Sequence, residues 1–176
     1  MGLEELRTDC AVKQKKGLHF ILASIIIWLL MLIIHVTSLP ILTKNLYTFY
    51  ATAPLMPLAF LISKLIKVDF QNKENPLTNL GILLSVGQIP YLLIAMWVFS
   101  AVPEKMLMIM AMIFGAHLLP FSWLYKSKSY MAFAIAIPFL ALLVGLYFAP
   151  YVLAIAMVGV EIVFSLCLVV ENRAAM

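Results

Sequence analysis

Long, unbroken apolar runs constrain this chain more than any other feature. The run SIIIWLLMLII at Ser24–Ile34 shows no alternation of polar and apolar residues, and other segments are equally apolar. A helix of about 20 mostly apolar residues is long enough to cross the roughly 30 Å hydrocarbon core of a bilayer. A transmembrane β-strand would instead alternate lipid-facing and lumen-facing residues. The chain is therefore predicted to be all-α, with its helices in a membrane.

Composition supports a polytopic transmembrane helical bundle. Of the 176 residues, 65% are hydrophobic and only 11% are charged, whereas about 25% are charged in a typical soluble domain. The bundle is expected to fill residues 17–171, between an N-terminal segment at 1–16 and a tail at 172–176, which leaves no room for a soluble catalytic domain. Six spans are predicted, at Leu18–Thr37, Leu46–Leu65, Leu77–Ala101, Met106–Tyr125, Ser129–Phe148 and Tyr151–Val170.

The basic residues predict how the bundle is oriented. Loops on the cytoplasmic side of membrane proteins carry an excess of lysine and arginine. If the N-terminus is cytoplasmic, only Lys44 and Lys105 lie outside, and the other ten basic residues lie inside: Arg7, Lys13, Lys15, Lys16, Lys64, Lys67, Lys73, Lys126, Lys128 and Arg173. We therefore expect both termini in the cytoplasm and the protein in the cell (inner) membrane. The basic charge is then an orientation signal, so no nucleic-acid partner is expected.

Three polar residues are predicted to lie near the middle of the membrane. His117, Glu161 and Gln88 each lie about a dozen residues from one end of a predicted span, which places them at similar depth because a helix rises 1.5 Å per residue. An ionisable group at the centre of a spanning helix costs about 2.5–3.5 kcal/mol on insertion scales, so such residues are often functional. They are the candidate substrate- or proton-binding residues, although spacing does not show whether they face one another.

Small and weakly polar residues suggest which side of the third span faces the bundle. Thr78, Gly81, Ser85, Gln88 and Ala95 share one helical face, and such residues favour close packing of membrane helices. Gln88 is therefore expected to point inward. Prolines occur at similar depth in four spans and free backbone carbonyl groups there: Pro54, Pro57, Pro90, Pro120 and Pro138. Broken helices at mid-depth are how many transporters build their sites.

These observations allow a functional and a structural interpretation. In the functional one, His117 and Pro120 form one wall of a midplane cavity opposite Glu161. A carboxyl group that is neutral at rest and becomes charged when water or a cation arrives would suit proton coupling. In the structural one, the same polar contacts only hold helices together, and proline is common in membrane helices.

No motif points to a catalytic site, a cofactor or a metal. HExxH, GxSxG and P-loop patterns are all absent from the sequence. His35 is expected to be hydrogen-bonded or wetted near the outer interface, and His19 to contact headgroups beside the cytoplasmic lysines. A bis-histidine haem would need two ligands at one depth, but both histidines lie roughly 10 Å in depth from His117 at 1.5 Å per residue.

Three stretches resemble a family of short, multi-span bacterial integral membrane proteins with no assigned activity. They are KQKKGLHFI at Lys13–Ile21, KENPLTNLG at Lys73–Gly81 and GAHLLPFSWLYKSKSYM at Gly115–Met131. The resemblance covers most of the chain. It implies the multi-span topology and implies no mechanism.

The sequence thus favours a small bundle that binds or translocates a solute, a proton or a lipophilic molecule. Two alternatives remain open: a structural or regulatory partner of another membrane protein or of its own copies, and, behind it, an intramembrane enzyme acting on lipid. A transporter predicts a polar cavity that reaches Glu161. A partner subunit predicts a groove of small residues facing lipid and no cavity, and an enzyme predicts three or more polar groups open to one interface.

Overall fold

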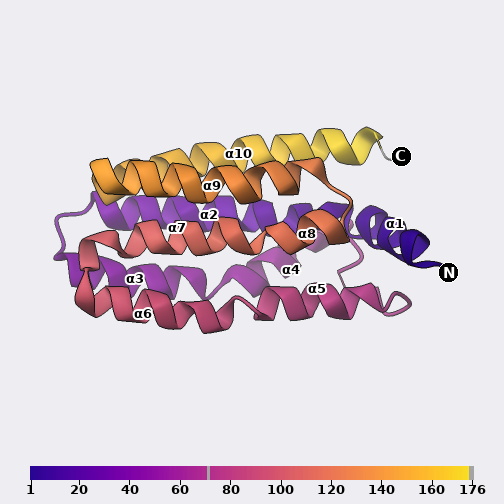
Figure 1. Ribbon diagram of the computed structural model, residues 1–176, viewed down its shortest axis with the longest axis horizontal. Helices are drawn as coiled ribbons and strands as arrows, with labels where there is room; N and C mark the ends of the chain where they lie inside the picture. The colour runs from indigo at the N-terminus through magenta and orange to yellow at the C-terminus, as the bar shows by residue number, and fades with distance from the viewer. Residues whose placement is uncertain (71, 175–176) are drawn as a thin grey trace.

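The computed structural model describes residues 1–70 and 72–174, and every regular element within these residues is a helix. Figure 1 shows the long helices running side by side, with the N- and C-termini at the same end of the bundle. An even number of crossings is required for that arrangement. Residues 175–176 of the expected tail lie outside the described residues, and Asn172–Ala174 continue the last helix.

The elements follow the expected order of spans. In chain order they are α1 (Leu3–Lys13), η1 (Lys15–Gly17), α2 (Leu18–Val36), α3 (Ile41–Thr52), α4 (Leu55–Leu65), α5 (Leu77–Val86), η2 (Ile89–Tyr91), α6 (Leu92–Ala101), η3 (Pro103–Lys105), α7 (Met106–His117), α8 (Leu119–Leu124), α9 (Lys128–Tyr147) and α10 (Pro150–Ala174). Five helical stretches are long and apolar enough to cross a bilayer, and α3 with α4, bent by 42°, gives a sixth. The all-α bundle predicted from the sequence is confirmed.

Three of the spans are interrupted near their middle, and each break lies beside a proline. Pro54 separates α3 from α4, Pro90 lies in the short 3-10 turn between α5 and α6, and Pro120 follows the junction of α7 and α8. Proline lacks the N–H that would continue the helical hydrogen bonds. Pro138, by contrast, lies inside an uninterrupted α9. The second span also begins earlier than expected, at Ile41, because the helix starts directly after Pro40.

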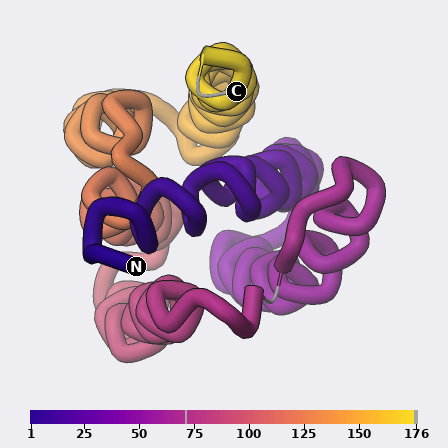
Figure 2. The backbone as a smooth tube through the Cα atoms, turned by 90° about the vertical axis from the view of Figure 1, so that its right-hand side faces the viewer, coloured from indigo at the N-terminus to yellow at the C-terminus, as the bar shows by residue number. Residues whose placement is uncertain are grey.

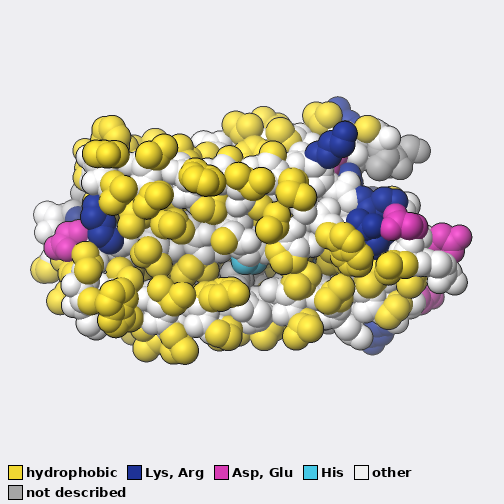
Figure 3. All heavy atoms as spheres, in the orientation of Figure 1, with side chains coloured by type: hydrophobic (Ala, Val, Ile, Leu, Met, Phe, Trp, Pro, Cys, Tyr) yellow, Lys and Arg dark blue, Asp and Glu magenta, His cyan; other side chains and the backbone are white. Residues whose placement is uncertain are grey.

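The spans enclose a common interior. In Figure 2, which looks along the bundle, α2 lies beside α10, α10 beside α9, and α9 beside α7. Span two packs on α2, and span three packs on α7 and α8. Hydrophobic side chains cover the visible face along its whole length, while charged side chains gather at the two ends (Figure 3). An apolar girdle with charged ends is the surface that a bilayer requires.

Helix α1 lies across the end of the bundle that carries both termini (Figure 2). The Asp9 carboxylate holds it there by accepting hydrogen bonds from the side-chain amides of Asn72 and Asn75, each at 2.8 Å. Two residues earlier in α1, Arg7 donates to the carbonyl oxygen of Trp123 and lies over its ring, 4.4 Å from the centroid. The short polar helix is therefore fixed by side chains from the loop after α4 and from α8.

Acid is expected to loosen this attachment. The hydrogen bond from Asn75, with smaller contributions from Lys13 and Asn72, holds the pKa of Asp9 below its ordinary value of 3.8 despite partial desolvation. A lowered folded-state pKa stabilises the fold above the unfolded-state pKa, and this stabilisation is lost as the pH falls through the folded-state value. Hydrogen exchange of the α1 amides, corrected for intrinsic rates, should therefore lose protection below about pH 4.

An Asp9→Asn variant should exchange faster already at pH 7 and lose this acid dependence. Asp69→Asn, which changes an exposed carboxylate in the neighbouring loop, is the control and should behave like the native protein. An unchanged acid response in Asp9→Asn would show that another group fixes α1.

Candidate functional site

The Glu161 carboxyl group is completely buried between α10 and α2. Its residue is 0% exposed, and Oε2 forms a hydrogen bond with the Ser24 hydroxyl group of α2. Its other oxygen, Oε1, has no hydrogen-bond partner among the described residues. A buried polar atom without a partner is costly and needs an explanation. One carboxyl oxygen is thus left without a partner among the described residues in the interior of the bundle.

The register between α2 and α10 explains why Ser24 and Glu161 meet. At the lysine-rich end, the ammonium group of Lys16, just before α2, lies 3.1 Å from the Glu171 carboxylate of α10. From these two positions, Ser24 is eight residues along one helix and Glu161 is ten residues along the other. At 1.5 Å per residue the depths are about 12 Å and 15 Å, which is within reach of a side-chain contact.

The Ser24 hydroxyl group couples Glu161 to the backbone of α2. Its oxygen is also 2.7 Å from the carbonyl oxygen of Ile21, to which it donates. A hydroxyl group has one hydrogen. The bond to Ile21 and the bond to Glu161 can therefore form together only when Glu161 is protonated and donates to the serine oxygen. If Glu161 loses its proton, Ser24 must turn its hydrogen from Ile21 to the carboxylate.

A cavity of about 180 Å³ lies on the other side of Ser24, where the breaks of spans two and three face α2 and α7. Three of its lining residues carry polar side chains: Ser24, Thr52 and Gln88. Trp28, which is only 3% exposed, also lines the cavity, and its indole ring carries an N–H donor. The remaining lining residues are apolar: Ile27, Met31, Leu55, Ile89, Leu92, Met110, Ile113 and Phe114.

The three candidate residues are only partly brought together. Gln88 lines the cavity, and Glu161 lies behind Ser24 in the cavity wall. His117 does not line this cavity, contrary to the expectation that it forms a wall with Pro120. Its Nδ1 atom lies 2.6 Å from the carbonyl oxygen of Phe114, and its ring packs edge-on to Phe121. His117 is the last residue of α7, and this local bond turns its ring back onto its own helix.

The other two histidines pack against neighbouring elements of the fold and do not line the cavity. His35 is buried and its Nε2 atom lies 3.1 Å from the Thr48 hydroxyl oxygen, which joins α2 to α3. The expectation that His19 contacts headgroups is wrong. His19 is 2% exposed and packs against the rings of Phe20 and Phe70. The loop after α4 folds back over it, which a count of residues along the helix does not reveal.

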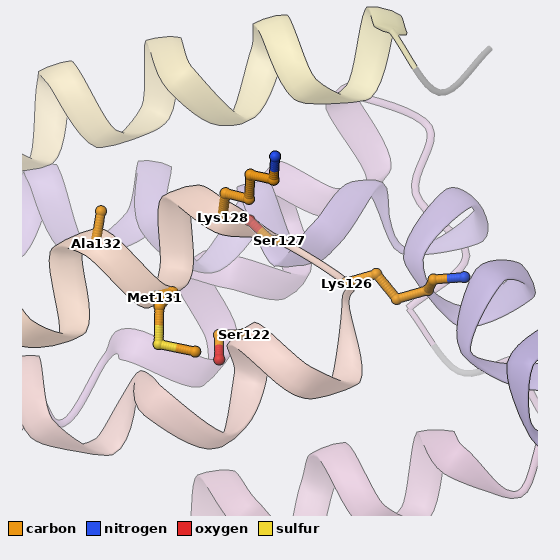
Figure 4. Close-up of a pocket in the computed structure, with 6 residues that line it drawn as sticks. All are labelled: Ser122, Lys126, Ser127, Lys128, Met131 and Ala132. Atoms are coloured by element: carbon orange, nitrogen blue, oxygen red, sulfur yellow. The ribbon is translucent and has the colours of Figure 1, made fainter.

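A second hollow, of about 350 Å³, lies at the lysine-rich end between α8 and α9 (Figure 4). Its polar side chains do not converge. Lys126 points toward α1, where it pairs with Glu4, and Lys128 points toward α10 in this view. The hydroxyl groups of Ser122 and Ser127 are bonded to Leu119 and Glu171. The cavity beside Ser24 is therefore the better candidate site.

The sequence predicts Glu161 and Gln88 as site residues but does not single out Ser24 and Thr52. Ser24 is the one polar residue of α2 between His19 and His35, so a search for isolated hydroxyl groups in apolar runs would have found it. Thr52 lies at the end of α3 and bonds to the carbonyl oxygen of Phe49. Within the described residues, no group of three or more His, Cys, Asp or Glu side chains is placed to hold a metal ion.

These observations define the class of the protein: a helical bundle with the length and apolar surface of a multi-pass membrane protein. The chain belongs to DUF7010, a family of unknown function, whose model matches residues 3–171. This confirms the expectation of a multi-span family without an assigned activity. No curated protein and no solved structure matches the chain.

Proposed function

We propose that this protein binds and translocates a small molecule at the cavity beside Ser24, with Glu161 as its proton-exchanging group. The observation that carries the proposal is the cavity at the junction of broken helices, with a buried carboxyl group one hydrogen bond away. Interrupted helices at mid-depth present backbone groups to a substrate and can rearrange around it. An intramembrane carboxyl group with an unused oxygen is suited to exchange a proton during that movement.

The cavity also separates this proposal from its alternatives. A purely structural subunit needs no internal space beside a buried acidic residue. A lipid-modifying enzyme would require polar groups at one membrane interface, whereas the polar lining of this cavity lies inside the bundle. In our proposal the lysine-rich end, with both termini, faces the cytoplasm, in keeping with the bias of basic residues. Labelling of a Lys73→Cys variant from the outside of intact cells would contradict this orientation.

Glu161→Gln is expected to abolish translocation while leaving the fold intact, because glutamine has the same shape and can still bond to Ser24. Proteoliposomes would be incubated in a small-molecule cell extract, washed, and analysed by mass spectrometry. A pH dye enclosed in the vesicles would report proton entry. We expect at least one class of compound to be enriched several-fold in vesicles with the native protein, and the enrichment to be lost in Glu161→Gln.

Glu104→Gln is the control and should transport like the native protein. It alters an exposed carboxylate at the end of the bundle that carries Lys105, away from both termini. Equal enrichment by the native protein and Glu161→Gln, at equal incorporation, would remove Glu161 from the mechanism. If native vesicles neither enrich a compound nor admit protons faster than empty ones, the proposal fails.

A further inference from the structure

The cavity has a deep floor and an exposed rim. Its floor is made by α2 and α7, where Trp28 and Met31 are each 3% exposed. Its rim lies at the breaks of spans two and three, where Leu55 is half-buried and Ile89 is 57% exposed. Helix α4 packs chiefly on α2, whereas α5 packs on α8 and α1. The side of the bundle between α4 and α5 is therefore loosely joined at the level of the cavity.

Toward the end that carries Lys44 and Lys105, the interior is closed by packed side chains. Ala95 and Val98 of α6 form a buried cluster with Met106 and Met110, against which further apolar side chains pack. Two of these, Phe49 and Phe99, have ring centroids 6.2 Å apart and join α3 to α6. Spans two and three are thus in contact between the cavity and the end that carries Lys44 and Lys105, and they separate at the level of the cavity.

The lysine-rich end is closed by polar contacts. Gln14, at the end of α1, accepts a hydrogen bond from the Tyr125 hydroxyl group at 2.9 Å and donates one to Thr78 at 3.2 Å. These groups are buried and link α1 to the ends of α8 and α5. Helix α1 lies across this end of the bundle (Figure 2). In the described part of the chain, packed or hydrogen-bonded side chains thus close the interior toward both ends of the bundle, whereas Ile89 at the rim is exposed on its apolar side.

We propose that the ligand is a lipophilic molecule with one hydrogen-bonding head group, which enters sideways from the bilayer between α4 and α5. This inference rests on the proposed function and specifies its substrate class. Most of the cavity wall is apolar and matches a hydrocarbon or aromatic body. The hydroxyl groups of Ser24 and Thr52 at the wall already donate to backbone carbonyl oxygens. The Trp28 indole N–H and the Gln88 amide therefore supply a donor and a donor–acceptor pair for one head group. Among the residues that the structure describes, no charged side chain lines the cavity, so a charged solute has no partner there.

A matched pair of photoreactive probes tests the ligand class. One is a trifluoromethyl-diazirinyl benzyl alcohol, and the other is the same molecule with a methyl group in place of the hydroxymethyl group. Both would be added to the native protein in liposomes, and labelled peptides would be identified by mass spectrometry. The alcohol is expected to label the Ser24–Met31 segment saturably and the hydrocarbon to label it far less.

Trp28→Phe keeps an aromatic side chain, although a smaller one, and removes the N–H donor. Loss of one hydrogen bond should lower labelling by the alcohol about tenfold and leave labelling by the hydrocarbon unchanged. Equal labelling by both probes, or no effect of Trp28→Phe, would overturn the assignment of the head group.

The route is tested by filling the rim. Ile89→Trp should slow labelling of the Ser24–Met31 segment, whereas Leu93→Trp, on the exposed outer face of α6, should not. A membrane-impermeant, sulfonated diazirine should leave the segment unlabelled. If the sulfonated probe labels it and Ile89→Trp has no effect, the cavity is filled from water: the sideways route falls and the proposed function stands. If no probe labels the segment, the cavity is not a ligand site, and both proposals fall.

Discussion

Gly115→Leu is expected to destabilise the bundle by about 3 kcal/mol or to prevent its folding. Gly115 lies in α7 where α9 crosses it, and a Cβ atom added there would lie 2.6 Å from Cδ of Pro138 and 2.7 Å from Cγ2 of Ile137. Neither neighbour yields easily, because one is a ring and the other is branched at Cβ. Even Gly115→Ala should cost about 1–3 kcal/mol. Unfolding of the purified protein by titration with a denaturing detergent measures the change.

Gly159 provides the matched control. It lies in α10, and beyond the adjacent backbone of that helix no heavy atom of the described residues lies within 4 Å of an added Cβ. Gly159→Leu should therefore be tolerated, and Gly159→Ala should be neutral or slightly stabilising, since alanine favours a helix by about 1 kcal/mol over glycine. If Gly115→Leu and Gly159→Leu had equal effects, close contact between α7 and α9 would not be a determinant of stability.

Glu171→Ala is expected to destabilise the bundle by a comparable amount, about 3 kcal/mol. The Glu171 carboxylate accepts four hydrogen bonds: from the Ser127 hydroxyl group at 2.7 Å, from the Ser129 backbone N–H and hydroxyl group at 2.8 Å each, and from the Lys16 ammonium group at 3.1 Å. It thus joins the end of α10 to the start of α9 and to the segment before α2. Alanine leaves the largely buried Lys16 without its counter-charge, and removing one partner of such a pair is more costly than removing both.

A double-mutant cycle with Lys16→Met isolates the pair. The double variant Lys16→Met/Glu171→Ala should be less destabilised than the sum of the two single variants, because interacting neighbours are not additive. Additive losses in the free energy of unfolding would mean that the ion pair contributes nothing beyond its separate groups. Glu171→Gln, which keeps an acceptor for the serines, should fall between the native protein and Glu171→Ala.

The candidate site could be predicted only in part. The depth of Glu161 follows from its place in a long apolar run, and the face of Gln88 follows from small residues spaced by helical turns. The bond between Ser24 and Glu161 joins residues 137 positions apart. It depends on how far each of two helices is rotated about its own axis and shifted along it. Both quantities come from packing between helices, which apolar residues of similar size specify only collectively.

The position of His117 also shows that depth in the membrane does not by itself predict which way a side chain points. Its depth suggested a place in the cavity, but a residue at the right depth can still point in the wrong direction. The breaks near Pro54, Pro90 and Pro120 were more predictable, since proline acts on the backbone locally. That these breaks border a cavity in two spans and not in the third was not predictable from local chemistry.

The sequence by itself determined the number of spans, the apolar surface and the clustering of basic residues at one end. These properties depend on the transfer of each segment between water and hydrocarbon, which is nearly a sum over single residues. Only the tertiary structure decided that Ser24 both lines the cavity and bonds to Glu161, that His19 and His117 do not line it, and that the breaks of spans two and three border it. Such features depend on the mutual rotation and register of whole helices, which are set by close packing among residues far apart in the chain.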